Sequence, residues 1–485
     1  MIYHSTRNPK LTASASEAIL KGIAPDGGLY VPDDIPKLDK SFTKLAKLDY
    51  PHLAYEVMKL FIDDFTPEEL MDAINSAYNT KNFDHEDITC LVEADGAYYL
   101  ELFHGRTIAF KDMALSILPY LMMTSARKCG VSEDIIILTA TSGDTGKAAL
   151  AGFDSVPGTG IVVFYPKDGV SPVQERQMVT QAGDNTHVIG IRGNFDDAQR
   201  EVKKAFTDEK LAARMLEAGY RFSSANSINI GRLVPQIAYY VYAYTRLMPK
   251  EINFVVPTGN FGNILAAYYA YRMGVPIHKL ICASNDNKVL YDFFKTGVYD
   301  RNREFILTSS PSMDILISSN LERLIAELAG EDTAKLMKQL SEEGRYELPA
   351  NSRSSEALQL FVGEFANEAE MSARIRELYG KEGYILDPHT AVASAAYEKY
   401  KNETGDDTCT VIASTASPYK FTRAVLTSID PKYSEMEDFA LFDELNKLSG
   451  VPVPKAIKDI ISAPVKHTSV CDKDKLIEEI EKIYL

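Results

Sequence analysis

Short apolar runs bounded by turn residues alternate with helical patterns along most of this chain. Such alternation is typical of parallel strands joined by crossover helices, so it predicts an α/β fold. Helices are expected at Asp196–Phe206 and, after a Gly-rich turn, at Leu265–Met273. The runs predicted as strands are Ile135–Ala140, Ile161–Tyr165, His187–Ile191, Ile252–Val256, Lys279–Ala283 and Thr410–Ser414.

The two ends of the chain differ from this pattern, and 485 residues are too many for one ordinary core. Helical segments near Ala13–Leu20 and Pro67–Tyr78 surround the turn-rich stretch APDGGLYVPDDIP. After about Ser417 the chain turns to short helices and a charged final helix. We therefore expect an N-terminal lobe over residues 1–95, a central α/β region over 96–420, and a C-terminal helical segment over 421–485.

Charge and cysteine spacing exclude several classes of protein. A formal net charge of −16 opposes binding to nucleic acid or to an anionic membrane. The five cysteines contain no CxxC pair, which argues against a zinc site of the usual spacing and against a disulfide framework. The histidines show no ligand spacing either, so no metal site is predicted. The first residues, MIYHSTRNPK, lack the apolar core of a secretory signal, and no apolar run is long enough to span a membrane. We expect a cytoplasmic protein.

The first chemical signal is a lysine, Lys111, that follows Phe110 and, with only Asp112 between, precedes the apolar run MALSILPYL. We expect this side chain at the start of a helix and partly out of water. Desolvation lowers the pKa of an ammonium group, and only the neutral amine can form an imine. The alternative is a surface lysine next to a core phenylalanine.

Two glycine-rich loops each lie between a predicted strand and a predicted helix. Residues Pro257–Asn263 (PTGNFGN) offer backbone N–H groups and a helix N-terminus, which suit a phosphate group. Residues Thr141–Gly146 (TSGDTG) offer small hydroxyls that suit a carboxylate, although Asp144 would have to point away or cap the helix. Both loops could also be plain turns. Walker and dinucleotide fingerprints are missing, which disfavours a nucleotide-binding protein.

A fourth segment, Ala413–Ser417 (ASTAS), ends the last predicted strand with hydroxyl side chains. A hydroxyl there could donate a hydrogen bond to a pyridine nitrogen, where many enzymes that use pyridoxal 5′-phosphate (PLP) place an aspartate. Together the four segments supply an imine-forming lysine, a phosphate cradle, a carboxylate loop and a partner for a ring nitrogen. All lie at loops or strand ends, where open α/β sheets bind their ligands.

Several of these segments, in the same order, resemble the threonine synthase family. They are LFHGRTIAFKDMAL, ATSGDTGKAAL, GVSPVQERQM, GNFDDAQ, NSINIGRLVPQ, PTGNFGN, SPSMDILISSN and DPHTAVA, and YHSTRN…APDGGLYVP resembles the opening lobe. The resemblance covers about residues 1–421. It implies the α/β fold of fold type II PLP enzymes, with two open, mostly parallel sheets flanked by helices plus an N-terminal lobe. It also implies conversion of O-phospho-L-homoserine and water to L-threonine and phosphate, with 96–420 as a PLP-binding catalytic region made of two α/β subdomains.

The resemblance implies roles for residues at matching positions. Lys111 matches the lysine that carries PLP as a Schiff base, and Thr415 matches the residue facing the pyridine nitrogen. The loop for the PLP phosphate is matched by Gly259, Asn260, Phe261, Gly262 and Asn263. The loop for the amino-acid end of the substrate is matched by Ser142, Gly143, Asp144 and Thr145, and the neighbourhood of the substrate phosphate by Asn226, Ser227 and Arg232. Arg232 could otherwise be a helix-surface arginine, and His389 in DPHTAV could be structural or catalytic.

The chain departs from the family at Arg106, often a proline, and in Thr415–Phe421, where TASPYKF stands for the common TAHPAKF. The second departure keeps an alternative open, a phospho-lyase that releases 2-oxobutanoate and ammonia without adding water. A catalytically silent binding protein of the same fold would be expected to lose the lysine or the phosphate loop, and both are present. For assembly, a monomer and a homodimer both stay open.

Overall fold

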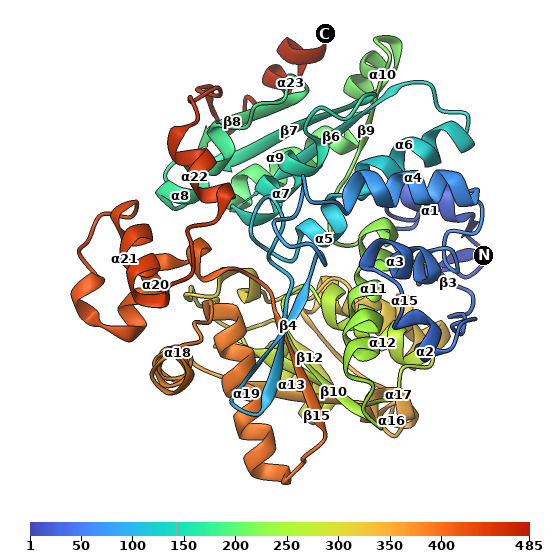
Figure 1. Ribbon diagram of the computed structural model, residues 1–485. Helices are drawn as coiled ribbons and strands as arrows, with labels where there is room; N and C mark the ends of the chain where they lie inside the picture. Colours follow the sequence, from blue (N-terminus) through green and yellow to red (C-terminus); the bar gives the residue numbers. More distant parts are fainter. Residues whose placement is uncertain (142) are drawn as a thin grey trace.

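Two open sheets dominate the computed structural model, which describes residues 1–141 and 143–485 (Figure 1). The larger sheet has the strand order β14-β11-β10-β15-β5-β4, and only the edge strand β4 runs antiparallel to its neighbour. Its strands are β4 (Cys90–Ala94), β5 (Ala97–Glu101), β10 (Ile252–Pro257), β11 (Ile277–Ser284), β14 (Phe361–Phe365) and β15 (Cys409–Ser414).

The smaller sheet is parallel throughout, in the order β16-β8-β7-β6-β9. All eight residues of its strand β7 are buried, as expected for a parallel sheet covered on both faces. Its strands are β6 (Asp134–Ala140), β7 (Thr159–Pro166), β8 (Thr186–Arg192), β9 (Tyr220–Ser223) and β16 (Val470–Asp472). The predicted fold class, two open and mostly parallel sheets flanked by helices with an N-terminal lobe, is confirmed.

Helices cover both sheets and lie between them. They are α5 (Asp112–Leu115), α6 (Leu118–Lys128), α7 (Asp144–Phe153), α8 (Pro172–Val179), α9 (Phe195–Thr207), α10 (Glu209–Glu217), α11 (Ile230–Leu247), α12 (Gly262–Arg272), α13 (Val289–Thr296), α14 (Leu321–Ala329), α15 (Thr333–Glu342), α16 (Ala350–Arg353), α17 (Glu356–Gln359), α18 (Glu368–Glu382) and α19 (Pro388–Thr404). The antiparallel pair of β12 (Val298–Asp300) and β13 (Arg345–Glu347) lies outside the two sheets. All six predicted strands are present, and the predicted helices at Asp196–Phe206 and Leu265–Met273 correspond to α9 and α12.

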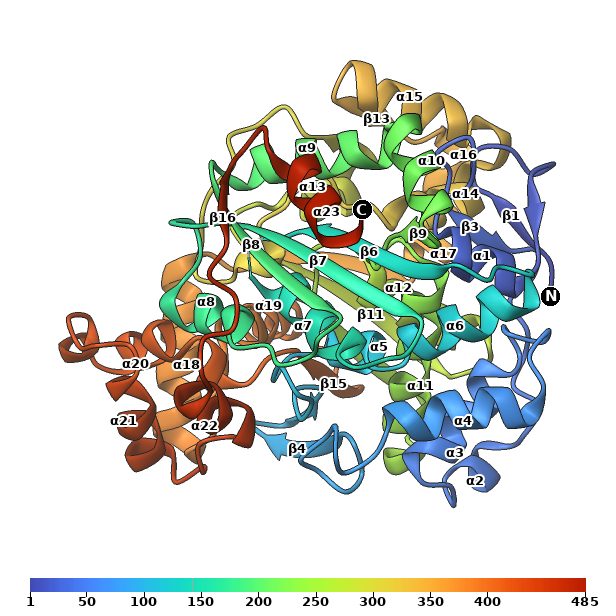
Figure 2. The same ribbon diagram turned by 90° about the horizontal axis from the view of Figure 1, so that it is seen from above.

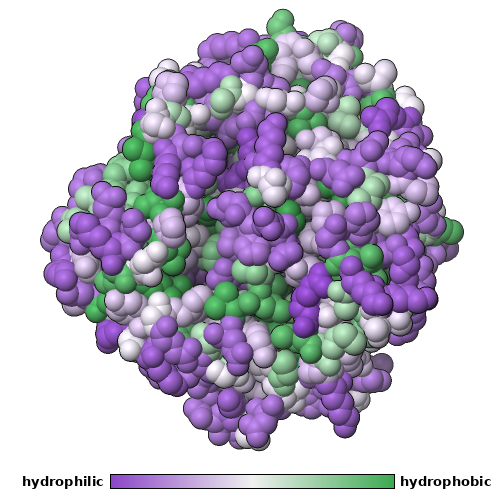
Figure 3. Space-filling view, in the orientation of Figure 1, coloured by the Kyte–Doolittle hydropathy of each residue, from purple (hydrophilic) through white to green (hydrophobic). Residues whose placement is uncertain are grey.

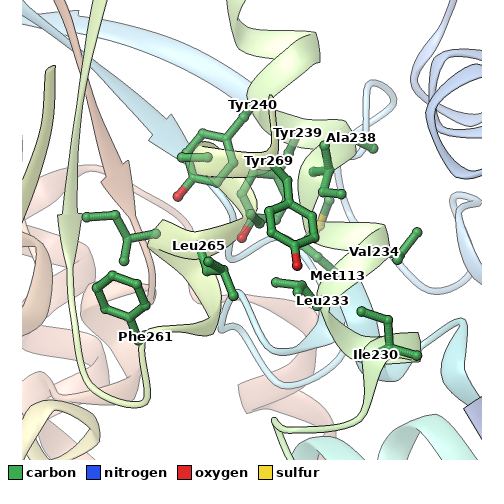
Figure 4. Packing of buried hydrophobic residues seen from close by; sticks show 14 of the residues in the cluster. Met113, Ile230, Leu233, Val234, Ala238, Tyr239, Tyr240, Phe261, Leu265 and Tyr269 are labelled. Atoms are coloured by element: carbon green, nitrogen blue, oxygen red, sulfur yellow. The ribbon is translucent and has the colours of Figure 1, made fainter. Parts of the chain in front are cut away.

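Helix α11 is buried along almost its whole length. Figure 4 shows its side chains, among them Leu233 and Tyr240, packed beside Leu265 of α12. Burial of large side chains on this scale fixes α11 and α12 relative to each other, because each side chain removed from water contributes about 1.5–3 kcal/mol. The start of α12, which carries the predicted phosphate loop, is therefore held by the core.

The N-terminal residues form a lobe that packs against these helices, on the right of Figure 1. A small antiparallel sheet joins β1 (Tyr3–Ser5) to β2 (Thr12–Ala13) and β3 (Tyr30–Pro32). The lobe helices are α1 (Ala15–Lys21), α2 (Phe42–Leu45), α3 (Tyr50–Met58) and α4 (Pro67–Ala77). Capping boxes at Ser14 and Thr66 explain why α1 and α4 begin where they do, close to the predicted starts.

The C-terminal segment holds the expected helices, α20 (Thr422–Ile429), α21 (Ala440–Ser449), α22 (Lys455–Ser462) and α23 (Leu476–Tyr484). It differs from a purely helical segment because it also supplies β16, which pairs with β8 at the edge of the smaller sheet. Seen from above in Figure 2, α23 lies over that sheet. A three-residue strand carries too little periodicity to be read from sequence, and only the pairing with β8 creates it.

Among the described residues, no helix is both long and apolar enough to cross a membrane. The face shown in Figure 3 is largely hydrophilic at its rim, and hydrophobic residues gather near its middle, between the two sheets.

Candidate active site

Lys111 and Thr415 lie side by side where the larger sheet meets α5. The N–H of Phe110 donates to the carbonyl oxygen of Thr415 at 2.8 Å, and the N–H of Ser417 donates to the carbonyl oxygen of Ile108 at 3.0 Å. Lys111 directly precedes α5, as the sequence predicted. Thr415 follows the end of β15 and is only 5% exposed. Its N–H donates to Oγ1 of Thr390 at 3.2 Å.

The side chain of Lys111 is 11% exposed, and its Nζ donates to Oγ of Ser312 at 3.0 Å. Burial lowers the pKa of Lys111 to about 8; the charges of Lys420 and Arg232 act in the same direction, and that of Asp144 opposes them. This is the desolvated lysine that its sequence context predicted. Such an amine is partly neutral near pH 7–8, so it can act as a nucleophile or as a base.

Asp144 is the anionic partner of this lysine. Its Oδ2 lies 3.9 Å from Nζ of Lys111 and accepts a hydrogen bond from Oγ of Ser312 at 3.1 Å. Its Oδ1 lies 3.3 Å from Nζ of Lys420, whose side chain is 1% exposed. Burial raises the pKa of Asp144, but the charges of Lys420 and Lys111 outweigh burial and hold the pKa well below its usual range. Asp144 is thus ionised and paired, not aimed at an incoming anion.

The loop around residues 143–145 opens the first turn of α7. Gly143 has φ 137°, and a β-carbon there would lie 2.5 Å from Nε2 of Gln174. The N–H groups of Gly143 and Gly146 both donate to Oγ1 of Thr141 at 3.0 Å. Thr145 is half-buried in the first helical turn, where N–H groups lack intrahelical partners. Ser142, predicted as part of this loop, lies outside the described residues.

The loop 259–263 joins β10 to α12. Phe261 adopts φ 65°, a left-handed conformation that is costly for a bulky residue and that gathers at functional sites. Its buried ring stays in place by packing on Phe294 and Phe361, with ring centroids 6.1 and 5.6 Å away. The N–H groups at the start of α12 have no intrahelical acceptors, so they remain available to an anion.

Asn263 and Arg232 each bury a donor that has no partner among the described residues. Oδ1 of Asn263 accepts from the hydroxyls of Tyr239 and Tyr240 at 2.5 and 2.6 Å, but its Nδ2 is unpaired. Both tyrosines appear in Figure 4 next to Leu265 of α12. Arg232 is 3% exposed, its Nη1 donates to the carbonyl oxygen of Ala225 at 3.1 Å, and its Nε is unpaired.

Arg232 is therefore not a helix-surface arginine. Burial lowers its pKa to about 10, which leaves it charged at neutral pH. Within residues 1–141 and 143–485 no carboxylate lies within ion-pair distance of it. A buried guanidinium without a carboxylate partner is costly unless an anion compensates it. The charge of Arg232 also helps to lower the pKa of Lys111.

The other two residues predicted near the substrate phosphate are less closely tied to this site. The carbonyl oxygen of Ser227 accepts from Nδ2 of Asn320 at 3.2 Å, and the N–H of Asn320 donates to the carbonyl oxygen of Asn260 at 3.0 Å. Ser227 is thereby connected to the loop 259–263. Asn226 is exposed, and its N–H donates to Oγ of Ser224 at 3.3 Å.

The residues that sequence reasoning did not single out are Ser312 and Lys420. The N–H of Ser312 donates to Nε2 of His389 at 3.1 Å, and Nδ1 of His389 lies 2.7 Å from Oδ2 of Asp387. Because Nε2 accepts a hydrogen bond, Nδ1 is the protonated nitrogen of His389. The same contacts hold Ser312, the hydrogen-bond partner of Lys111, in place. Both missed residues lie within segments quoted above, SPSMD and SPYKF, but their residue types gave no chemical reason to select them.

These groups fit a ligand that has an aldehyde and a phosphate. Lys111 supplies a partly neutral amine, and the start of α12 supplies N–H donors for a phosphate. Nδ2 of Asn263 and Nε of Arg232 supply two further donors, both buried and without a protein partner among the described residues. PLP has both functional groups, and its other polar atom, the ring nitrogen, could accept from a hydroxyl such as that of Thr415.

Three regions of the chain match families of known proteins. Residues 2–78 match the family described as threonine synthase N terminus, residues 91–415 match pyridoxal-phosphate dependent enzyme, and residues 390–480 match threonine synthase, C-terminal. The cofactor of the chain is therefore PLP.

Whole-chain relatives agree with these matches. Threonine synthase of Saccharomyces cerevisiae is 36% identical, over 100% of this chain and 99% of that one. Human threonine synthase-like 1 is 40% identical, over 96% of this chain and 63% of that one. The crystal structure of PLP-bound threonine synthase from Brucella melitensis superimposes with a TM-score of 0.88 at 35% identity, over 100% and 99% of the two chains. The chain belongs to the threonine synthase family.

Proposed function

We propose that this protein converts O-phospho-L-homoserine and water to L-threonine and phosphate. The observation that carries the proposal is the position of Lys111, a buried amine with a pKa of about 8. Its Nζ donates a hydrogen bond to Ser312. Its pKa is also lowered by the charge of Arg232, a buried side chain that has no carboxylate partner among the described residues. An amine for the cofactor and a cation for a phosphate ester are what this reaction requires.

We propose that Lys111 carries PLP and that the loop 259–263 binds its phosphate. Gly259, Asn260, Phe261, Gly262 and Asn263 would surround that phosphate with backbone N–H groups and the Asn263 amide. The hydroxyl of Thr415 would face the ring nitrogen. When bound, the cofactor supplies a sink for negative charge at the carbon next to the amino group of the substrate.

We also propose Lys111 as the residue that moves protons. Its Nζ would take the proton from the α-carbon of the substrate and return it at the end of the reaction. Ser312 is within hydrogen-bond distance of both Lys111 and Asp144, so its hydroxyl can hold Nζ in one orientation. Because Lys420 pairs with Asp144, the carboxylate of Asp144 is partly neutralised and does not repel an anionic substrate.

The substrate would be held at its two anionic ends. The loop of Ser142, Gly143, Asp144 and Thr145 would receive the amino-acid carboxylate at the start of α7. Arg232 would bind the phosphate through its planar guanidinium, with Asn226 and Ser227 beside it. All these residues come from one chain, so the proposal applies to a monomer and to a homodimer alike.

We further propose how the chain is divided into regions and in which compartment the protein works. Residues 96–420 would form the catalytic region, preceded by the lobe of 1–95 and followed by the segment 421–485. A cytoplasmic location is supported by the five cysteines, all of which are free thiols. The net charge of −16 supports a protein without nucleic-acid or membrane partners.

The test is an assay of three products from O-phospho-L-homoserine. Purified holoenzyme should release phosphate and L-threonine in equal amounts, with no 2-oxobutanoate. Phosphate accompanied by 2-oxobutanoate and ammonia would instead identify the phospho-lyase. Because Arg106 and the TASPYKF segment are the departures from the family, an Arg106→Pro variant and a variant carrying TAHPAKF should give the same product ratio as the natural sequence.

A further inference from the structure

A second cluster of reactive side chains lies outside the site described above. Cys90 begins β4, Glu101 ends β5, and the two residues are paired directly across the hairpin. His104 follows in the loop that leads from β5 towards Lys111. All three residues are half-buried, and the side chains of Glu101 and His104 are 13% and 17% exposed. The β4 edge of the larger sheet lies near the middle of Figure 1.

The three side chains face one another at distances that suit a tetrahedral metal ion. Sγ of Cys90 lies 3.6 Å from Nε2 of His104 and 3.5 Å from Oε2 of Glu101, and Nε2 and Oε2 are 3.0 Å apart. Zinc bonds of about 2.3 Å to sulfur and about 2.0–2.1 Å to nitrogen and oxygen give tetrahedral edges of about 3.5, 3.5 and 3.3 Å. One ion can therefore touch all three atoms after shifts of a few tenths of an ångström.

The remaining polar atoms of the cluster already have partners. Nδ1 of His104 lies 3.2 Å from Oδ1 of Asp84, so Nε2 is the ring nitrogen that faces the other two ligand atoms. Oε1 of Glu101 accepts from the hydroxyl of Tyr384 at 2.8 Å, which leaves Oε2 free. Metal-binding histidines are commonly oriented by a carboxylate at the other ring nitrogen, and metal-binding carboxylates by a hydrogen-bond donor at the other oxygen. Asp84 and Tyr384 occupy these two positions.

We propose that Cys90, Glu101 and His104 form a binding site for one Zn²⁺ ion, with a fourth position open to water. Zn²⁺ is favoured over Mg²⁺ and Ca²⁺ because thiolate and imidazole are ligands that those hard cations avoid. Within residues 1–141 and 143–485, no other three histidine, cysteine or acidic residues bring their ligand atoms this close. Binding releases two protons to solvent, the thiol proton of Cys90 and the proton that Nε2 of His104 shares with Oε2 of Glu101.

Such an ion would connect the edge strand β4 to the loop that ends at Lys111. The loop is already attached at this point, because the N–H of Asp84 donates to the carbonyl oxygen of His104 at 2.9 Å. Further along, the N–H of Thr107 donates to Oδ2 of Asp112 at 2.8 Å. Zn²⁺ would therefore stabilise the fold around Lys111 without touching substrate or cofactor.

The experiment uses tag-free holoenzyme that has been treated with a chelator, passed through a desalting column and titrated with Zn²⁺. Native mass spectrometry should show one zinc per chain, and X-ray absorption at the zinc edge should show one sulfur at about 2.3 Å. At a zinc concentration about 100 times the dissociation constant, the melting temperature should rise by about 3 °C.

The deciding comparison is between two cysteine variants. Cys90→Ser should weaken zinc binding at least tenfold, whereas Cys129→Ser, which changes an exposed cysteine elsewhere, should leave it unchanged. The absorption band of bound PLP reports that each variant is folded, and His104→Ala should repeat the loss. Zinc that binds equally well to Cys90→Ser, or no zinc retained by the unaltered protein, would overturn the proposal.

Discussion

A β-carbon at Gly259 would lie 2.2 Å from the carbonyl oxygen of Ser312. The loop 259–263 and the segment that contacts Lys111 are therefore in direct backbone contact. Ser312 in turn donates its N–H to His389 and its hydroxyl to Asp144. The proposed phosphate site and the proposed catalytic lysine thus both contact Ser312. A substitution that moves the loop 259–263 should therefore also move the hydrogen-bond partner of Lys111.

Gly259→Ala should lower both stability and cofactor affinity. The new methyl group meets backbone, which cannot rotate away, so we expect a loss of about 1–3 kcal/mol in the free energy of unfolding. The matched control is Gly380→Ala in α18, where a β-carbon meets nothing within 4 Å. That change should be neutral or stabilising by about 0.5–1 kcal/mol. Urea unfolding and PLP titration measure both effects, and equal behaviour of the two variants would contradict the proposed coupling.

Arg232→Ala should reduce kcat/KM for O-phospho-L-homoserine by about 10- to 100-fold. This range corresponds to the loss of a charge-assisted contact of about 1.5–3 kcal/mol. Arg232→Lys keeps the charge but loses the planar fork, so its kcat/KM should lie between those of Arg232→Ala and the unaltered protein. Arg192→Ala, an exposed control, should match the unaltered protein. If Arg232→Ala loses PLP but keeps its KM, the arginine serves the cofactor and not the substrate.

The rate at which cofactor-free protein takes up PLP should depend on the ionisation of Lys111. Only the neutral amine reacts, so the rate should rise with pH and reach half its maximum near pH 8, not near 10.5. Asp144 raises the pKa of Lys111, so Asp144→Asn should shift this midpoint to lower pH. Stopped-flow absorbance at several pH values tests both statements. A midpoint in Asp144→Asn at or above that of the unaltered protein would exclude the proposed charge effect.

Thr415→Asp should change the balance of products. A hydroxyl cannot keep a pyridine nitrogen protonated, whereas a carboxylate can, and a protonated ring withdraws more charge. We expect a larger share of side products such as those of transamination, measured as oxo acid per threonine. Thr415→Ser keeps a hydroxyl and serves as the control. An unchanged ratio in Thr415→Asp would show that Thr415 does not face the ring nitrogen.

Much of the fold follows from local sequence pattern. The strands that build the centre of each sheet are buried on both faces, so they appear as continuous apolar runs, and the turns after them are rich in glycine. Strands at the edges are harder to predict. Tyr220–Ser223 and Val470–Asp472 are short and partly polar, and they become strands only because a neighbouring strand offers hydrogen-bond partners.

In the candidate site, too, some residues could be predicted from local sequence and others only from tertiary contacts. The burial of Lys111 could be predicted from its neighbours Phe110 and the apolar run that follows Asp112. The loops could be predicted because they follow apolar strands and are rich in glycine. Ser312 and Lys420 could not, because their partners are brought to them by tertiary packing. The cluster of Cys90, Glu101 and His104 was likewise hidden, since it depends on hairpin register and not on a regular spacing. The prediction that the chain has no metal site rested on spacing alone.

The most direct test of the account is to locate the lysine that carries PLP. Borohydride treatment of the holoenzyme fixes the cofactor covalently, and peptide mass spectrometry then identifies the modified residue. We predict that the phosphopyridoxyl group lies on Lys111 and that Lys111→Ala loses both the label and the visible absorption band. A label on one of the other buried lysines, Lys147 or Lys420, would contradict the proposed active site.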